Sequence, residues 1–263
     1  MKILVLVKRV EDPEIKIKVR ADGKGIETDG MKYVVNPFDE IAVEEALRIR
    51  DTHGGEVVVG CVGPKDATHQ IRTTLAMGAD KAIHVVTDAD TDPSQDTLAY
   101  VKLVEEQKPD VVLMGKQAID DDMGQTGVLL AEALELGQVT CASKEESLES
   151  EAEKAKKPAF TFKDGRAVVV REVDGGIETL SVALPAVITC ELRLNVPRYA
   201  SLPGIMKAKK KEIAERPFSE FAAGQAPVVV VQKMVPPAAR KAGVKVPDVA
   251  ALMGKLRQEA KVI

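Results

Sequence analysis

Residues 111–127, VVLMGKQAIDDDMGQTG, combine a short apolar run, a glycine, a polar loop and the beginning of a helix. The run from Val111 to Met114 predicts a strand that is buried on both faces. Gly115 allows the backbone to turn and a ligand to come close. Asp122 and Gln125 have the spacing of a capping box, which predicts a helix that continues to Leu134. The first N–H groups of such a helix have no intrahelical partner, so they attract an anion such as phosphate.

The same alternation of strand and helix precedes this stretch. Buried strands are predicted at 2–7, 56–62 and 82–86, and helices begin near Asn36-Pro37, Asp66 and Asp92-Pro93. Strands that alternate with helices of about 10–15 residues indicate right-handed crossovers and a parallel sheet covered on both faces. The predicted fold class is therefore α/β, with a doubly wound, mostly parallel, Rossmann-like sheet of the kind that binds adenine nucleotides.

Three regions depart from this alternation. Residues 15–25 predict an exposed hairpin, and residues 144–190 predict added antiparallel, hairpin-like strands at 159–162, 167–170, 179–182 and 186–189. A basic helix is predicted at 205–215, followed by an extended tail and a last helix at 248–260. We therefore expect an α/β domain at 1–224 and a C-terminal arm at 225–263. The arm either wraps a partner subunit or folds back on its own domain.

Composition excludes several classes of protein. The net charge of −4 gives no case for nucleic-acid binding, and no apolar run approaches the roughly 18 residues of a membrane span. The apolar start of the chain is too short for a signal peptide. Three widely spaced cysteines indicate a reducing compartment, and three histidines without ligand spacing predict no metal site.

Motifs of catalysis are missing from the sequence. It contains no G-x-G-x-x-G, no G-x-x-x-x-G-K-[ST] and no nucleophile elbow. We therefore expect a mononucleotide to bind without chemistry at the carboxyl ends of the strands, with its phosphate on the helix start at Gly124–Gly127. The three aspartates at 120–122 suit Mg²⁺, ribose hydroxyls, or a cap with two solvated neighbours. Lys116 suits either the phosphate or an aspartate.

Three motifs extend the argument beyond the strand pattern. They are NPFDEIAVEEA at 36–46, the 115–127 loop, and LRLNVPRYASLP at 192–203, which runs into IMKAKKK at 205–211. With these motifs, and with residues 76–80 and 171–176, nearly the whole chain resembles the β subunits of electron transfer flavoproteins.

The resemblance implies a function for each motif. In that family an α and a β subunit form a heterodimer, FAD is held mainly by the α subunit, and the β subunit buries a structural AMP. The protein accepts electrons from flavoprotein dehydrogenases and passes them to a quinone oxidoreductase or a similar acceptor, without catalytic residues of its own. Its location would be the bacterial cytoplasm, or the mitochondrial matrix in a eukaryote. No membrane insertion is expected.

Site residues are carried over by motif. The implied AMP contacts are Leu6, Asn36, Pro37, Phe38, Asp39, Val62, Gly115, Lys116, Gln117, Ala118, Ile119, Asp120, Asp121, Asp122, Met123, Gly124, Gln125 and Thr126. The implied partner-recognition residues, within a loop at 192–211, are Arg198, Tyr199, Ala200, Ser201, Leu202, Pro203, Gly204, Ile205, Met206 and Lys207. Leu202 would be the apolar anchor, the lysines of 207–211 would steer acidic partners or form a solvated face, and Glu172 would pair with an arginine of the α subunit.

Two comparisons within the family refine this interpretation. Many relatives carry a tyrosine that touches the flavin in the loop after the first strand, where this chain has Pro13 at or near the position. Bifurcating relatives hold a second FAD in place of AMP and resemble G-D-T-A-Q-V-G-P in the nucleotide loop. Residues 121–127, DDMGQTG, favour AMP instead. The alternatives from other classes are a nucleotide-sensing domain resembling universal stress proteins and an adenylate-handling synthetase, whose pyrophosphate loop is missing.

Overall fold

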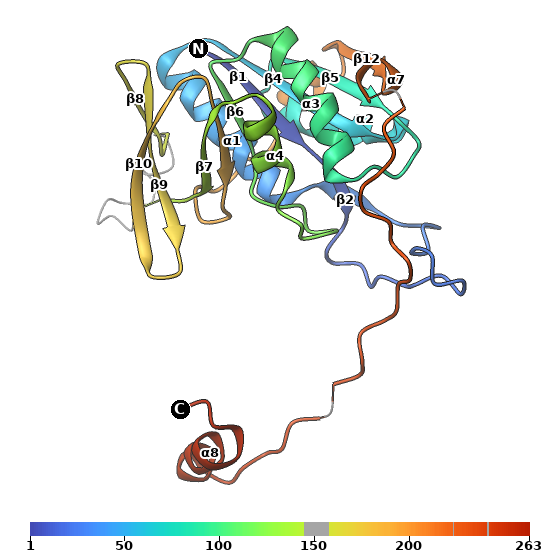
Figure 1. The fold of residues 1–263 in the computed structure, drawn as a ribbon, viewed down its shortest axis with the longest axis vertical. Coiled ribbons are helices and arrows are strands. Elements are labelled where there is room, and N and C mark those ends of the chain that lie inside the picture. The colour runs from blue at the N-terminus through green and yellow to red at the C-terminus, as the bar shows by residue number, and fades with distance from the viewer. Residues whose placement is uncertain (145–157, 223, 241) are drawn as a thin grey trace. The chain divides into compact units, whose positions relative to one another are not determined.

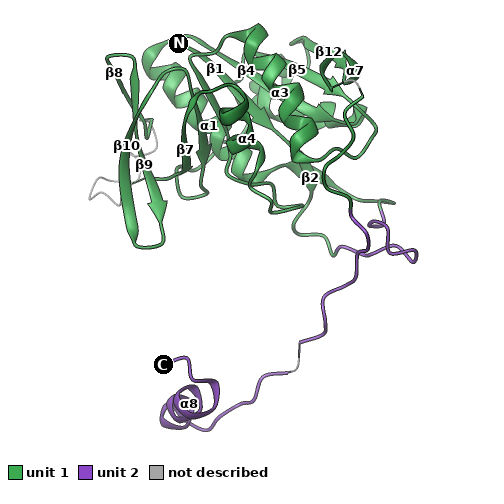
Figure 2. Ribbon diagram, viewed as in Figure 1, with its two compact units in different colours: residues 1–16, 28–230 green, residues 17–27, 231–263 purple. Residues whose placement is uncertain are grey.

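The computed structural model describes residues 1–144, 158–222, 224–240 and 242–263. Its described residues fall into two compact units, one of residues 1–16 and 28–230 and one of residues 17–27 and 231–263 (Figure 2). The first unit holds the main sheet and the helices that cover it. The part of the predicted antiparallel region at 145–157 lies outside the described residues.

Seven strands of the first unit run parallel, in the order β7-β11-β6-β1-β4-β5-β12 (Figure 1). They are β1 (Lys2–Val7), β4 (Glu56–Gly63), β5 (Lys81–Val86), β6 (Val111–Gly115), β7 (Gly137–Ala142), β11 (Ala186–Cys190) and β12 (Ile213–Pro217). An antiparallel group of β8 (Thr161–Lys163), β9 (Arg166–Val173) and β10 (Gly176–Ala183) joins beyond β7. β2 (Arg9–Glu11) and β3 (Tyr33–Val35) form a separate two-stranded sheet.

The helices pack on both faces of this sheet, and each face has its own hydrophobic core. They are α1 (Pro37–His53), α2 (Thr68–Met77) after a 3-10 turn at Lys65–Ala67, α3 (Pro93–Gln107), α4 (Thr126–Ala133), α6 (Leu202–Ala208) and α7 (Ser219–Ala222). Alternate residues of β1 face opposite ways: Ile3, Val5 and Val7 join the core under α1 and α2, whereas Leu4 and Leu6 join the core under α3 and α4.

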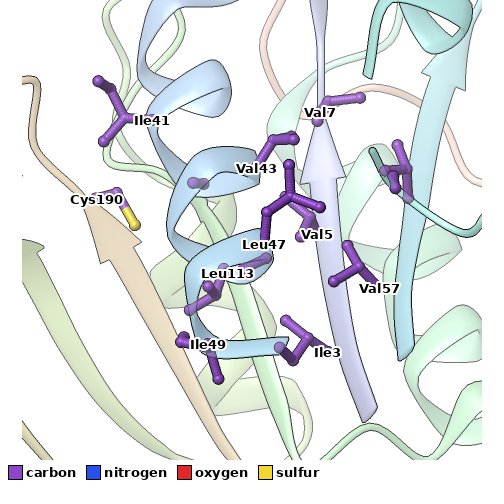
Figure 3. Packing of buried hydrophobic residues seen from close by; sticks show 14 of the residues in the cluster. Ile3, Val5, Val7, Ile41, Val43, Leu47, Ile49, Val57, Leu113 and Cys190 are labelled. Carbon is purple, nitrogen blue, oxygen red and sulfur yellow. The ribbon is translucent and has the colours of Figure 1, made fainter. Parts of the chain in front are cut away.

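Close packing of α1 on the sheet is visible in Figure 3, where Val43 and Leu47 lie against Val5. The chain moves from β1 to β4 and β5 through α1 and α2, and then returns through α3 to β6 on the other side of β1. The strand order therefore reverses between β1 and β6. This arrangement confirms the doubly wound, mostly parallel fold.

Several local predictions were wrong. Residues 186–190 form an inner parallel strand rather than part of the antiparallel group, and residues 213–217 form an edge strand beside β5 rather than the end of a basic helix. The strand β7 was not predicted at all. The hairpin predicted at 15–25 is present in a short form, in which an antiparallel bridge joins Val19 and Ile26 and the Glu27 N–H donates to the Lys18 carbonyl at 2.8 Å. These segments are short, so their partners far away in the chain decide their state.

Helix starts also differ from the capping predictions. The capping box of Asp92 and Gln95 is present, but α4 begins at Thr126 with no side-chain cap, so the box predicted at Asp122 and Gln125 is wrong. Asp66 lies in the 3-10 turn and does not cap α2. Asn36 precedes α1 without capping it, because its side chain is used elsewhere.

The second unit contains α8 (Val249–Lys255), which continues as a π-helical turn at Leu256–Ala260. Asp248 caps α8 through the backbone N–H of Ala251, at 2.7 Å. Residues 17–27 belong to the same unit, and the Met234 N–H donates to the Gly23 carbonyl at 2.7 Å. The boundary between domain and arm at 224/225 remains a prediction.

Candidate functional site

A cleft of about 550 Å³, including solvent at its mouth, lies at the carboxyl ends of β1 and β6. It is lined by the end of β1, the start of α1, the 115–127 loop and the start of α3. Open α/β sheets bind ligands at this point of strand reversal.

Asp39 holds the two strand ends together. One carboxylate oxygen accepts from the backbone N–H of Lys8 at 2.7 Å, and the other accepts from the N–H of Gly115 at 2.8 Å. Burial raises the pKa of Asp39 to about 7, although both hydrogen bonds and Lys8 favour its charged form. This carboxyl group therefore braces the floor of the cleft, and its oxygens are already used within the chain.

Asn36 fixes the loop above that floor. Its side-chain amide donates to the Gln117 carbonyl at 2.8 Å and accepts from the Ile119 N–H at 3.3 Å. Its own N–H donates to the Lys8 carbonyl at 2.9 Å. The NPFD motif is thus a structural clasp, in which Asn36 and Asp39 connect β1, β6 and the loop.

Two glycines, Gly115 and Gly127, are required by close packing. A methyl group at Gly115 would lie 2.5 Å from an Asp39 carboxylate oxygen and 2.5 Å from the Phe38 Cβ. A methyl group at Gly127 would lie 2.5 Å from the Thr189 Cγ2 on β11. Gly115 also lines the cleft, so its approach to a ligand stays a prediction. Gly124 has a φ of +61°, which favours glycine.

The three aspartates are engaged within the chain. Lys8 contacts Asp120 at 2.8 Å and Asp121 at 3.0 Å, and Asp122 accepts from the Gln117 amide at 2.6 Å. Burial alone would lower the pKa of Lys8, but the two aspartates raise it overall. Among the residues that the structure describes, no group of three or more His, Cys, Asp or Glu side chains is arranged to hold a metal ion.

Lys116 pairs with a glutamate. Its ammonium lies 2.5 Å from Glu191, which directly follows β11, and this partner raises the pKa of Lys116. The ammonium also lies 5.5 Å from the centre of the Phe38 ring. The aspartate predicted as a partner of Lys116 is therefore wrong, and its contact with a phosphate stays a prediction.

The structure brings most of the predicted AMP contacts to this one cleft. Its lining includes Leu6, Asn36, Asp39, Gly115, Lys116, Gln117, Ala118, Asp121, Met123, Gly124, Gln125 and Thr126. It does not include Pro37, Phe38, Val62, Ile119, Asp120 or Asp122. The lining also contains Gly127, which belongs to the predicted phosphate site, and residues that were not predicted as ligand contacts: Val7, Lys8, Thr91, Pro93, Asp96, Tyr100 and Met114.

The segment 198–207, predicted to recognise partners, combines an exposed tip with a half-buried foot. Leu202 is 74% exposed and Tyr199 is 98% exposed, so Leu202 is not a core residue. Ser201 caps α6 through the Gly204 N–H at 3.1 Å. A methyl group at Gly204 would lie 2.6 Å from the Ala76 carbonyl oxygen, so α6 rests directly on α2.

Arg198 forms that foot. Its Nε donates to Glu44 at 2.8 Å and its Nη1 donates to Asp51 at 3.1 Å, both on α1. Glu44 is buried and also pairs with Arg48 at 2.7 Å. Arg198 therefore connects the segment to α1, and the exposed contacts belong to the residues that follow it.

Glu172 and the start of the arm have contacts within the first unit. Glu172 lies 3.2 Å from Arg193, and both side chains are partly exposed. Asp92, which caps α3 at the rim of the cleft, accepts from the N–H groups of Val228 and Val229 at 2.5 and 2.9 Å. Thus the chain leaves the domain beside the cleft.

Fold and cleft together define a class: a doubly wound α/β protein with a ligand cleft at its strand reversal. Residues 24–221 match the electron transfer flavoprotein domain. The chain is 48% identical to the electron transfer flavoprotein subunit beta of Bradyrhizobium diazoefficiens, with both chains covered completely. It is 46% identical to the mitochondrial subunit beta of Oryza sativa subsp. japonica and 44% identical to the human subunit beta, over 100% and 99% of those proteins. The chain therefore belongs to the electron transfer flavoprotein family, among the β subunits. In the part of the chain that is described, no helix is long and apolar enough to cross a membrane.

Proposed function

We propose that this chain is the β subunit of a heterodimeric electron transfer flavoprotein, which binds a structural AMP and docks partner dehydrogenases. FAD, held mainly by the α subunit, would supply the redox chemistry. The chain would act as a carrier subunit without catalytic residues of its own. The observation that carries the proposal is the cleft at the strand reversal, combined with membership of the family.

Three features of the cleft support AMP as its occupant. The start of α4 presents backbone N–H groups at Thr126 and Gly127 toward an anion, and both residues line the cleft. The apolar side chains of Leu6, Met114 and Tyr100 line the same cleft and suit a base. Lys8 offsets part of the negative charge of the acidic loop, which reduces the repulsion between the loop and a phosphate.

Docking of dehydrogenases is supported by the exposed tip of the 198–207 segment. A large apolar side chain that is mostly exposed on an anchored helix suits a binding hot spot. Lys207, Lys209 and Lys210 are exposed beside it and would attract acidic partners.

Contacts with the α subunit are proposed for the arm and for Glu172. The arm carries exposed apolar residues, including Val228, Val230 and Val244, which suit burial against another chain. Glu172 would exchange its exposed partner Arg193 for an arginine of the α subunit. The final acceptor would be a quinone oxidoreductase or a similar protein. The location would be the bacterial cytoplasm, or the mitochondrial matrix in a eukaryote, as the names of plant relatives indicate for those proteins.

Nucleotide analysis of the heterodimer tests the proposal. The chain is purified with the α subunit encoded in the same genome, the complex is denatured, and the released nucleotides are quantified. One FAD and one AMP per heterodimer is the expected result. Two FAD and no AMP would indicate the bifurcating form. A chain that never associates with a flavin-binding subunit would refute the proposal.

A domain resembling universal stress proteins is not favoured. The relatives match over the full length of this chain, including the 198–207 segment and the arm. A stand-alone nucleotide sensor leaves both of these regions without a function.

A further inference from the structure

Asp96 lies in the first turn of α3 and lines the cleft, outside every motif that the sequence analysis used. Only 9% of the residue is exposed. Its Oδ1 atom is buried and has no hydrogen-bond partner among the described residues. Buried polar atoms are nearly always hydrogen-bonded, and leaving one unpaired destabilises the fold. An orphaned carboxylate oxygen at a ligand cleft therefore points to a hydrogen bond completed by the ligand.

The surroundings of Asp96 define which ligand group can bind. The nearest cation that lines the cleft, Lys8, is held by Asp120 and Asp121 at 2.8 and 3.0 Å. Thr91 donates a hydrogen bond to the Asp96 carboxyl group, which leaves that group an acceptor. Burial raises the pKa of Asp96 to about 6, so the group is mostly ionised at pH 7. A carboxylate in this environment repels phosphate and attracts an O–H or N–H donor.

Phosphate and carboxylate must therefore occupy different parts of the cleft. The start of α4 attracts the phosphate, as argued above, and α3 presents Asp96 to the remainder of the molecule. In the proposed AMP complex, which this inference presupposes, the remainder is the nucleoside. Its donors are the two ribose hydroxyls and the amino group of the purine, and carboxylates bind ribose hydroxyls in other nucleotide-binding α/β folds.

We infer that Asp96 is a specificity-determining residue of the cleft, whose Oδ1 accepts a hydrogen bond from the nucleoside part of the bound nucleotide. It orients the nucleotide with its phosphate toward α4. It also distinguishes nucleosides by the presence of one donor, because an analogue without that donor leaves the buried carboxylate unpaired.

The test uses the heterodimer after its nucleotide has been removed. Binding of AMP, 2′-deoxy-AMP, 3′-deoxy-AMP and purine riboside monophosphate is measured by calorimetry for the unchanged protein, Asp96→Asn and Asp96→Leu. Glu105→Leu is the matched control, because Glu105 is an exposed carboxylate on the same helix that does not line the cleft. Thermal unfolding of each variant without nucleotide confirms its folding.

One analogue should bind the unchanged protein about tenfold or more weakly than AMP, since a hydrogen bond to a charged group is lost. Asp96→Leu should bind AMP and that analogue equally, while Glu105→Leu keeps the full preference. A deoxy analogue identifies a ribose hydroxyl, and the purine riboside identifies the amino group. If Asp96→Leu keeps the affinity for AMP and every preference of the unchanged protein, the inference is overturned although AMP binding stands. Failure of the unchanged protein to bind AMP would instead overturn the proposed function.

Discussion

The cleft and the 198–207 segment differ in the kind of side chain that they bury and the kind that they expose. In the cleft, polar side chains are withdrawn from water and joined to distant backbone groups, as Asp39 joins Lys8 to Gly115. In the 198–207 segment, apolar side chains such as Leu202 face solvent, and only the foot at Arg198 is tied to the domain. A preorganised pocket needs fixed walls, whereas a docking surface needs exposed apolar area on a positioned base. Substitutions should therefore affect stability at the first region and partner contact at the second.

The largest effect is expected from Gly115→Ala. Its methyl group would meet Asp39 and Phe38 at 2.5 Å, so α1 must move away from β6 and the clasp must open. We expect a loss of stability of about 3 kcal/mol and loss of the bound nucleotide, measured by urea unfolding and nucleotide analysis. Gly175→Ala is the control, because nothing lies within 4 Å of its added carbon. Equal stability of the two variants would contradict the packing argument.

The next largest effect is expected from Asp96, as a dependence of folding stability on pH. Burial raises its folded-state pKa to about 6, above the unfolded value of 3.8, so folding favours the protonated form. Stability from this group is present at pH 4 and is lost as pH rises through 6. The difference corresponds to up to about 3 kcal/mol.

Unfolding of the nucleotide-free protein at pH 4.5 and 7.5 measures this dependence. Asp96→Asn should be more stable than the unchanged protein at pH 7.5, and the advantage should shrink at pH 4.5. Asp39 and Glu45, whose pKa values burial raises to about 7, contribute with the same sign in both proteins and cancel in the comparison. An advantage that is independent of pH would show that Asp96 is not the titrating group.

Arg198→Ala should affect both stability and partner contact, each to a moderate degree. It removes partners of Glu44 and Asp51 and releases the foot of the segment, while Arg48 still neutralises Glu44. Because Arg198 is partly exposed, we expect a stability loss of about 1 kcal/mol. Reduction by the partner dehydrogenase should also require a higher protein concentration for half-maximal rate. An unchanged concentration dependence would mean that the segment needs no anchor. Arg166→Ala, at an exposed arginine on β9, is the control.

The smallest effect on stability is expected from Leu202→Ala, within about 0.5 kcal/mol, because the side chain is mostly exposed. Reduction of the heterodimer by its dehydrogenase should nevertheless slow about tenfold, with unchanged nucleotide content. Ile177→Ala, at a residue that is 52% exposed on β10, is the control. If electron transfer is as fast as in the control, Leu202 is not the anchor.

Sequence alone predicted the parts whose signal is local. Apolar runs located β1, β4, β5 and β6, and the cap at Asp92 located α3. The parallel direction of those strands and the position of the cleft at their carboxyl ends followed from general rules of α/β folds.

The missed parts depend on contacts between distant residues. The strand at 213–217 carries charged residues, which are typical of edge strands. Together with the lysines that precede them, these residues led to the prediction of a helix. Lys8 and Asp96 were not predicted as residues of the cleft. Lys8 follows a strand and belongs to no motif, and Asp96 has the position of an ordinary acidic residue in a first helical turn. Only their distant neighbours give these residues a role. An all-buried run at 186–190, by contrast, already had the pattern of an inner parallel strand.

The position of β11 has a consequence for synthesis of the chain on the ribosome. β11 pairs with β6 on one side and with β7 on the other, so two earlier strands stay unconnected until residue 190 has emerged. A nascent or truncated chain that stops before this point exposes two unpaired strand edges, which are templates for aggregation. The halves of the sheet are thus joined late, and the 115–127 loop after β6 gains its contacts with Thr189 and Glu191 only then.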